Sequence, residues 1–401
     1  MGFPLSSKLN VVQPSPTIAI TRKAAELRRQ GRDVISLSQG EPDFDTPLHI
    51  REAAKAAMDA GATRYTDVDG TPELKLAIVD KFQRENGLAY ETSQITVGTG
   101  GKQVIFNAFF ASINEGDEVI IPAPYWVSYP DIVRMSGGTP VVLSCTEGNA
   151  FKLSAEQLRA AITPKTKWLV LNSPSNPTGS AYTTQELREI ADVLLDCPDV
   201  YVMTDDIYEH IRYDDWQVST IAAVEPRLLH RTLTCNGVSK AFSMTGWRIG
   251  YAGGPADLIR AIATIQSQST TNPNSIAQAA AVAALNGPLD FIAERNAIFQ
   301  ERRDIAARLL NAIPGVSCRI PEGAFYLFPS CAGLIGKKTP QGNILQTDED
   351  VAGYLLEQAL VAVVPGSAFG MSPFFRISFA TKTERLTDAC GRIAEACRLL
   401  E

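Results

Sequence analysis

The sequence has few of the residues that build metal sites and disulfide frameworks. Its 401 residues include three histidines, at positions 49, 210 and 230, and seven cysteines without a CxxC pair. None of the histidines is at metal-ligand spacing from another, so we expect neither a zinc site nor a Ser-His-Asp centre. An odd number of scattered cysteines is typical of free thiols in a reducing compartment.

The chain also lacks basic clusters and long apolar runs. With 37 Lys and Arg against 44 Asp and Glu, its net charge is −7, which gives no general attraction to nucleic acid or to an anionic membrane. No apolar run approaches the roughly 20 residues that span a bilayer, and the first part of the chain has no signal-peptide pattern. We expect a cytoplasmic protein with neither nucleic acid nor membrane as a partner.

What the sequence does contain is material for a large core and a regular alternation of elements. Its residues are 45% hydrophobic, enough for roughly two or three domains. Helical patterns, such as 184–195 and the stretch capped by Thr71 and Pro72, alternate with short apolar runs that indicate buried strands. These runs cover 118–121, 167–172, 200–204 and 232–235. The alternation predicts an α/β fold with a mostly parallel sheet covered on both faces.

Three polar residues follow successive predicted strands. Asn176 comes after the strand at 167–172, Asp205 closes the next, and Lys240 follows the one after that. Ligands of open α/β sheets bind beyond the carboxyl ends of the strands, so these three side chains should face one crevice.

The segment around Lys240 has the composition of a pyridoxal phosphate attachment site. Ser239 precedes this lysine and Arg248 follows eight residues later, between apolar runs with few other charges. The cofactor needs an amine for a Schiff base and a guanidinium for its phosphate, and the two residues can supply both. Apolar surroundings should lower the pKa of Lys240 and make it a better nucleophile.

A glycine-rich turn at 98–103 precedes a predicted helix that runs through Phe110. Backbone N–H groups at such a turn can bind phosphate without a net positive charge. Its spacing fits neither GxGxxG nor GxxxxGK[ST], which argues against a dinucleotide fingerprint and a P-loop. A plain helix-start turn is the alternative.

Several motifs together resemble one family, the class I (fold-type I) pyridoxal phosphate-dependent aminotransferases, in their bacterial aspartate aminotransferase branch. They occur in the family's order and cover nearly the whole chain. The matching pieces are Ser38-Gln-Gly-Glu-Pro-Asp-Phe44, Thr63-Arg-Tyr-Thr66, the Gly98 turn, Pro124-Tyr-Trp-Val127, Asn176-Pro-Thr-Gly179, Asp205-Asp-Ile-Tyr208, the Ser239 to Arg248 stretch and Phe375-Arg-Ile-Ser378.

The resemblance implies a catalytic role for Lys240 and ring contacts for four further residues. Lys240 would form the internal aldimine and later carry the proton between the substrate α-carbon and the cofactor. Asp205 would pair with the pyridine nitrogen, and we expect the adjacent Asp206 to be the more solvated of the two. The ring would also contact Trp126 on its face and Asn176 and Tyr208 at its phenolic oxygen.

The resemblance also implies how the phosphate and the substrate are held. The phosphate would be bound by Ser239, Arg248, the backbone of Gly100, Gly101 and Lys102, and Tyr65 from a partner subunit, so the active site would be shared in a homodimer. Arg376 would bind the substrate α-carboxylate through two parallel hydrogen bonds. The other implied substrate contacts are Gly40, Trp126, Asn176 and, at the distal carboxylate, Thr17 and Lys102.

The family layout implies a large domain, 46–304, with a seven-stranded mostly parallel sheet flanked by helices. A smaller α/β domain would combine 1–45 and 305–401. In its C-terminal part we expect strands at 316–319, 324–328, 361–364 and 374–378, and helices at 347–360 and 384–399.

The implied reaction is a ping-pong transamination of L-aspartate with 2-oxoglutarate. Two alternative activities remain open from the residues: a prephenate aminotransferase, which forms arogenate, and an aromatic aminotransferase. A pyridoxal phosphate-dependent lyase or decarboxylase and a noncatalytic protein of the same fold are the remaining alternatives, and the retained Lys240, Asp205 and Arg376 argue against the last.

Overall fold

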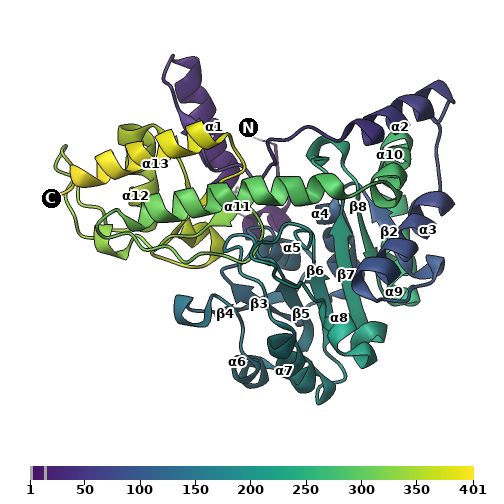
Figure 1. The fold of residues 1–401 in the computed structure, drawn as a ribbon. Coiled ribbons are helices and arrows are strands. Elements are labelled where there is room, and N and C mark those ends of the chain that lie inside the picture. Colours follow the sequence, from purple (N-terminus) through teal and green to yellow (C-terminus); the bar gives the residue numbers. More distant parts are fainter. Residues whose placement is uncertain (1–2, 13–15) are drawn as a thin grey trace.

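The computed structural model describes residues 3–12 and 16–401. It has a central seven-stranded sheet between layers of helices and a smaller group of helices and short strands, and the long helix α11 (Asp290–Asn311) runs along both (Figure 1).

The central sheet is mixed and mostly parallel. Its strand order is β2-β8-β7-β6-β5-β3-β4, with β8 antiparallel to both of its neighbours and the other pairs parallel. The strands are β2 (Ile95–Gly98), β3 (Glu118–Ala123), β4 (Thr139–Ser144), β5 (Thr166–Asn172), β6 (Tyr201–Asp205), β7 (Thr232–Gly237) and β8 (Gly250–Gly253). All four strands predicted from short apolar runs are among them.

Alternate residues of the strands pack on opposite faces of this sheet. Trp168 and Val170 lie in one apolar cluster, whereas Leu169 and Leu171 lie in another. Because side chains of a strand alternate in direction, this division shows that both faces are buried, as predicted. The first cluster includes residues of α4 (Gly101–Ser112), α5 (Tyr129–Met135) and α9 (Ala256–Ser267), and the second includes residues of α6 (Ala155–Ala161), α7 (Thr184–Leu195) and α8 (Ile221–Val224).

A third cluster lies beside the β2 and β8 edge. It joins residues of α2 (Leu48–Asp59), α3 (Pro72–Lys81) and α10 (Ser275–Asn286) to Ile95 and Tyr251. The Leu74 N–H donates to the Thr71 hydroxyl at 3.3 Å, so α3 begins with the predicted cap.

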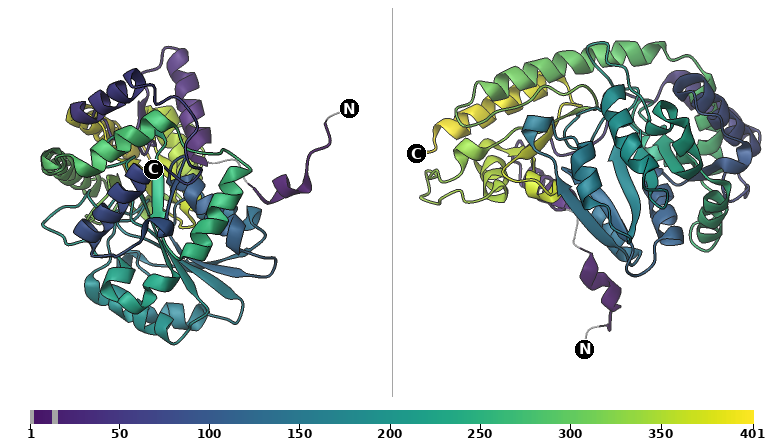
Figure 2. Two further views of the ribbon diagram at one scale, coloured as in Figure 1. Left: turned by 90° about the vertical axis from the view of Figure 1, so that its right-hand side faces the viewer. Right: turned by 90° about the horizontal axis from the view of Figure 1, so that it is seen from below.

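The smaller group has its own core around α11. Helices α1 (Pro16–Arg29), α12 (Asp348–Tyr354) and α13 (Thr383–Arg398) surround short strands, and α13 packs along α11 (Figure 1). Strand β1 pairs with β10, and β12 lies between β11 and β9. The strands are β1 (Ile35–Ser36), β9 (Tyr326–Leu327), β10 (Val361–Ala362), β11 (Val364–Pro365) and β12 (Phe375–Ser378). Residues 3–12 project from the molecule as an arm that contacts it at α5 (Figure 2).

Two C-terminal predictions need correction. Residues 316–319 do not form a strand, because only Ser317 bridges to Ser330. The Asn311 side chain bonds both the N–H and the carbonyl of Cys318, at 2.8 and 2.9 Å, and so takes the backbone groups that a ladder needs. The helix predicted at 347–360 ends as α12 at Tyr354 and continues as one π-helical turn, Leu355–Ala359.

Over the described residues, no single helix is long and apolar enough to cross a membrane. Helices α10 and α11 meet the length and composition criteria only as a pair, and this pair is bent by 85°.

Candidate active site

A cavity of about 570 Å³ lies at the carboxyl ends of β5, β6 and β7. The predicted residues Asn176, Asp205 and Lys240 all line it, so the three strand ends do face one crevice. The other predicted residues in its wall are Gly40, Gly101, Lys102, Trp126, Tyr208, Ser239, Arg248 and Arg376.

The Lys240 ammonium lies between charged groups in this cavity. Its Nζ donates to the Gly40 carbonyl at 2.6 Å. Burial lowers the pKa of Lys240 to about 8, and the positive charge of Arg376 acts in the same direction. Since a neutral amine is the nucleophilic form, Lys240 is suited to attack a carbonyl carbon near neutral pH.

Asp205 ends β6 and points into the same cavity. Its Oδ2 accepts a hydrogen bond from the Tyr129 hydroxyl at 2.7 Å, and burial raises the pKa of the carboxyl. No ion pair of Asp205 occurs within residues 3–12 and 16–401. A buried carboxylate that lacks a cationic partner favours a protonated ring nitrogen placed against it.

Asn176 is held by neighbours on two strands. Its N–H donates to Asn172 Oδ1 at 2.8 Å, and Asn172 Nδ2 in turn donates to the Asp205 carbonyl at 2.7 Å. Asn176 Oδ1 accepts from Arg376 Nη1 at 2.8 Å. Because its acceptor oxygen is used in this way, the amide NH₂ of Asn176 is directed to other partners, such as a phenolic oxygen.

Tyr208 is buried beside Lys240 and bonds to another tyrosine. The ring centroid of Tyr208 is 5.7 Å from Lys240 Nζ, and its hydroxyl is 2.8 Å from that of Tyr326. Burial raises the pKa of Tyr208 well above its usual value, so the hydroxyl remains a proton donor across the physiological range.

The predicted phosphate site lies at the start of α4. Gly101 and Lys102 are its first residues and line the cavity, as do Ser239 and Arg248. Gly100 differs from the prediction, because its N–H donates to the Gly98 carbonyl at 2.8 Å and it is outside the lining. A Cβ at Gly100, whose φ is +88°, would clash with Arg248 Nη2. Gly100 therefore makes room for the arginine, while Gly101 and Lys102 present their N–H groups.

Arg376 lies on β12 and is 3% exposed. In addition to its bond to Asn176, its Nη2 donates to the Ser38 carbonyl at 2.6 Å. In the part of the chain that the structure describes, its buried Nε has no hydrogen-bond partner and no carboxylate forms an ion pair with it. A buried guanidinium with an unused donor is prepared for a substrate anion.

Lys102 also lines the cavity, and its Nζ lies 4.9 Å from the centroid of the Trp126 ring. Burial and the neighbouring Arg248 lower the pKa of Lys102. Thr17 lies in the first turn of α1, and its side chain is outside the described residues. Thr21, one helical turn further on, lines the cavity, so this face of α1 is directed toward the site.

Tyr65 is not in the cavity of its own chain. It is 89% exposed, which places it on the surface instead. Its predicted phosphate contact therefore depends on a second subunit.

Sequence reasoning missed several residues of the cavity wall, three of which carry polar side chains bonded within the site, and it misjudged one position beside the wall. Tyr129, Asn172 and Tyr326 line the cavity, but in the sequence they resemble ordinary core or strand-end residues. Asp206, which was expected to be the more solvated aspartate, is 2% exposed, accepts from the Thr204 hydroxyl at 2.6 Å and has its pKa raised by burial to about 7. That expectation was wrong because Asp206 remains bonded to the buried strand β7, where its N–H donates to the Cys235 carbonyl at 2.9 Å.

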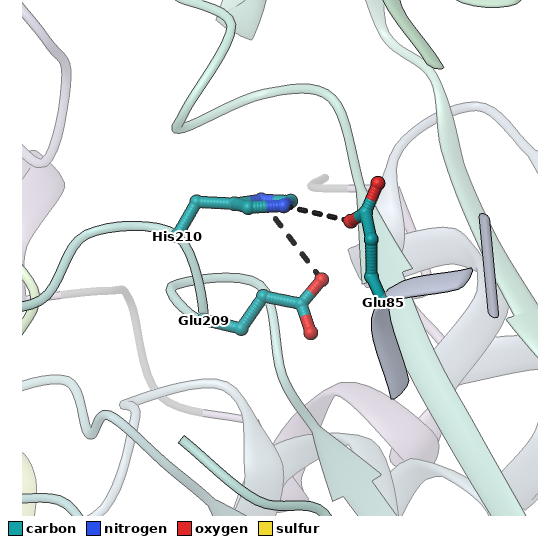
Figure 3. A group of neighbouring side chains, drawn as sticks. All are labelled: Glu85, Glu209 and His210. Carbon is teal, nitrogen blue, oxygen red and sulfur yellow. Dashed lines mark hydrogen bonds and ion pairs between the residues drawn. The ribbon is translucent and has the colours of Figure 1, made fainter. Parts of the chain in front are cut away.

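Glu85, Glu209 and His210 form a polar cluster in which Glu209 is buried and the other two are partly exposed (Figure 3). Among the described residues, these are the side chains of metal-ligand type that lie close enough to share an ion. The ammonium of Lys81, which is fully buried, pairs with Glu209 and lies 3.6 Å from Glu85. A cation is thus already supplied by the protein itself.

The residues of the cavity suit pyridoxal phosphate. Four cationic side chains, Lys102, Lys240, Arg248 and Arg376, line the cavity of a chain whose net charge is −7. The α4 N-terminus and Arg248 offer donors to a phosphate, and Asp205 offers a carboxylate to a ring nitrogen. Arg376 would still be available for a carboxylate of the substrate.

Comparisons with known proteins agree with this geometry. The profile of the family described as "Aminotransferase class I and II" matches residues 32–393. The chain is 59% identical over 397 residues to the aspartate/prephenate aminotransferase of Cereibacter sphaeroides, with 99% of each chain covered. It is similar to the crystal structure of the aspartate aminotransferase from Rhizobium meliloti, at 57% identity and a TM-score of 0.97 over 100% of both chains. The Thermus thermophilus aspartate aminotransferase with maleate is 42% identical, with a TM-score of 0.92 over 98% of this chain and 100% of that one.

Proposed function

The chain belongs to the aminotransferase class I and II family, and we propose that it transfers the amino group of L-aspartate to 2-oxoglutarate, giving oxaloacetate and L-glutamate. As a member of this family, it is a pyridoxal phosphate-dependent enzyme. The observation that carries the proposal is the placement of Lys240, Asp205 and Arg376 in one cavity.

Lys240 is the residue that binds the cofactor and moves the proton. When bound, pyridoxal phosphate supplies a carbonyl carbon for amines and a ring that accepts electrons from the substrate α-carbon. The Lys240 amine, with its pKa lowered to about 8, would be free once the cofactor holds the substrate and would accept the α-proton at Nζ. Asp205 holds a proton on the ring nitrogen, because its own buried carboxylate is stabilised by that positive charge.

Substrate orientation is assigned to groups at opposite sides of the cavity. Arg376 binds the α-carboxylate, assisted by the Gly40 N–H, and Asn176 keeps the guanidinium in place through its 2.8 Å bond. Lys102, together with Thr17, binds the distal carboxylate of aspartate or glutamate. The aspartate aminotransferase from Thermus thermophilus was crystallised with maleate, a dicarboxylate, which supports the same substrate class here.

We further propose that the active unit is a homodimer in which Tyr65 completes the phosphate site of the partner. Two features support it. Tyr65 is 89% exposed, and the extended N-terminal end exposes Phe3 and Leu5 at 85% and 72%. Apolar side chains on an extended arm are stable when they cover another surface, and a second subunit offers one.

The proposed division into a large domain, 46–304, and a discontinuous small domain, 1–45 with 305–401, follows the two groups of elements. Its second boundary lies within α11, whose Phe299 and Leu310 share one apolar cluster. Arg376 and Gly40 belong to the small domain and Lys240 to the large one, so closure would assemble the substrate site and exclude water.

Prephenate is the second candidate amino acceptor, in a reaction that yields arogenate. The specific support is the similarity to the aspartate/prephenate aminotransferase of Cereibacter sphaeroides, and prephenate carries two carboxylates that the same cations could bind. Steady-state assays of the purified holoenzyme, with aspartate as the donor and either 2-oxoglutarate or prephenate as the acceptor, test both. Formation of pyruvate, ammonia or carbon dioxide in place of transamination products would reject the proposal in favour of a lyase or decarboxylase.

A further inference from the structure

The hydroxyl of Tyr326 has one hydrogen-bond partner in the described structure, and that partner is Tyr208. The two oxygens are 2.8 Å apart in a buried setting, and the rings meet edge to face with centroids 5.7 Å apart. Tyr326 comes from β9, whereas Tyr208 follows β6 in the other group of elements. The pair is thus a contact between the two halves of the cavity.

The two tyrosines differ in acidity, and the Arg376 guanidinium lies 4.5 Å from the centroid of the Tyr326 ring. Burial raises the pKa of both tyrosines, that of Tyr208 to well above its usual value, and the positive charge of Arg376 opposes the rise at both. The contact with Tyr326 raises the pKa of Tyr208 further, so Tyr326 is the more acidic of the two. The more acidic hydroxyl of a pair is the stronger donor, so Tyr326 donates and Tyr208 accepts.

Because Tyr208 accepts the hydrogen bond from Tyr326, its own hydroxyl proton is available to another acceptor. A hydroxyl that accepts one hydrogen bond becomes a stronger donor in the next, because the bonds polarise one another. The assigned acceptor of Tyr208 is the phenolic oxygen of the cofactor, and this step rests on the proposed function. A stronger donor there draws negative charge away from the proton on Lys240 Nζ and makes that proton easier to lose.

We infer that Tyr326 is a positioning residue that aims and strengthens the Tyr208 hydroxyl and thereby lowers the pKa of the Lys240-bound cofactor. Its hydroxyl also lies close against the backbone at Gly40, where a Cβ would clash with it. The charged groups that act on Lys240 are Arg376, Glu41, Asp205 and Arg248. None of them changes when the Tyr326 oxygen alone is removed.

The test is a pH titration of the visible absorption of the holoenzyme. Tyr326→Phe removes only the hydroxyl, and we expect the titration midpoint to rise by about 0.5 pH unit, the scale of one cooperative hydrogen bond in a chain. Tyr354→Phe is the matched control, because it removes a buried hydroxyl that donates to the Ala396 carbonyl at 2.8 Å, in the same apolar cluster as Tyr326 but outside the cavity lining. Its midpoint should equal that of the wild type.

The double variant tests whether Tyr326 acts through Tyr208. In Tyr208→Phe the titration midpoint should already be raised, and adding Tyr326→Phe to this variant should not raise it further. An unchanged midpoint in the single Tyr326→Phe protein, or an equal further rise in the Tyr208→Phe background, would overturn the inference. Wild-type protein that forms no absorbing adduct would instead overturn the proposed function, and this inference with it.

Discussion

Arg376 Nη1 donates a hydrogen bond to Asn176 Oδ1 at 2.8 Å, so the loop after β5 positions a guanidinium that belongs to β12. The second terminal nitrogen is fixed by the Ser38 carbonyl at 2.6 Å. The arginine is therefore preorganised by two other segments of the chain before any substrate arrives. Preorganised donors lose little freedom on binding, which makes this contact a main source of affinity for the α-carboxylate.

Arg376→Lys should lower kcat/KM for L-aspartate by about 10²-fold or more, because a lysine cannot reproduce two parallel hydrogen bonds to a carboxylate. Steady-state kinetics of the holoenzyme measure the loss. Arg231→Lys is the control, since this buried arginine bonds the carbonyls of Leu194, Cys197 and Val200 outside the cavity. Equal losses in kcat/KM for the two variants would show that the effect of Arg376→Lys is structural.

Asp205→Asn should reduce kcat by about 10²-fold or more, because a neutral amide no longer stabilises a proton on the ring nitrogen. Tyr129→Phe keeps the carboxylate and removes only the hydrogen bond of 2.7 Å to it, so its loss should be near tenfold or less. Single-turnover rates with L-aspartate compare the two. If Asp205→Asn had the same single-turnover rate as Tyr129→Phe, the negative charge of Asp205 would have no role in the reaction.

The depressed pKa of Lys240 predicts how the apoenzyme takes up pyridoxal phosphate. The rate of covalent attachment should rise about tenfold per pH unit up to a pH of about 8 and level off above it, as the neutral amine becomes the main form. Stopped-flow absorbance of apoenzyme mixed with cofactor gives this profile. A rate that keeps rising toward pH 10, as for an ordinary lysine, would contradict a pKa lowered by burial.

The cluster around Glu209 should matter for stability. The Glu209 carboxylate pairs with buried Lys81 and accepts from Asn86 Nδ2 at 2.6 Å and Asn236 Nδ2 at 2.7 Å. Glu209→Gln leaves the Lys81 charge poorly compensated and should cost about 3–5 kcal/mol of unfolding free energy. Urea titrations give the unfolding free energy of each variant. Asp196→Asn, which breaks an exposed ion pair with Arg159, should lower it by about 1 kcal/mol or less. Equal losses of unfolding free energy in the two variants would show that the Glu209 cluster stabilises the protein no more than an exposed ion pair does.

The contribution of the same cluster to stability should be lost at low pH. Hydrogen bonding by His210 and the charge of Lys81 outweigh the effect of burial and hold the pKa of Glu85 at about 2, and the pKa of Glu209 is lowered as well. Carboxylates with depressed folded-state pKa values stabilise the protein above their unfolded pKa, near 4.5 for Glu, and this contribution is lost as the pH falls toward 2. Unfolding titrations across this window should show a smaller acid loss in Glu209→Gln than in the wild type. An identical acid dependence in the two proteins would contradict this assignment.

The sequence predicted the features that depend on local pattern. The α7 range, the Thr71 cap and the four internal strands follow from periodicity and capping, and Asn176, Asp205 and Lys240 were brought together by the rule for strand ends. It could not predict the features that depend on side-chain contacts between distant segments. Tyr129 and Tyr326 look like core aromatics until their hydroxyls are seen to bond Asp205 and Tyr208.

The burial of Asp206 also depends on contacts that the sequence does not reveal. Its place after the expected catalytic Asp205 made a solvated position plausible, but its bonds to Cys235 and Thr204, which the sequence does not reveal, keep it buried. The missing strand at 316–319 has a similar cause, because its apolar pattern is compatible with a ladder whereas Asn311, at the end of a preceding helix, binds the Cys318 backbone.

The most direct test of the account is the absorption spectrum of the pyridoxal phosphate-loaded protein during addition of L-aspartate alone and then of 2-oxoglutarate. We expect aspartate to convert the bound cofactor to its shorter-wavelength amine form and the keto acid to reverse the change, because the amino group is carried by the enzyme between the two substrates. A spectrum that aspartate leaves unchanged would contradict the proposed donor. A cofactor that never absorbs as an adduct of Lys240 would contradict the central claim.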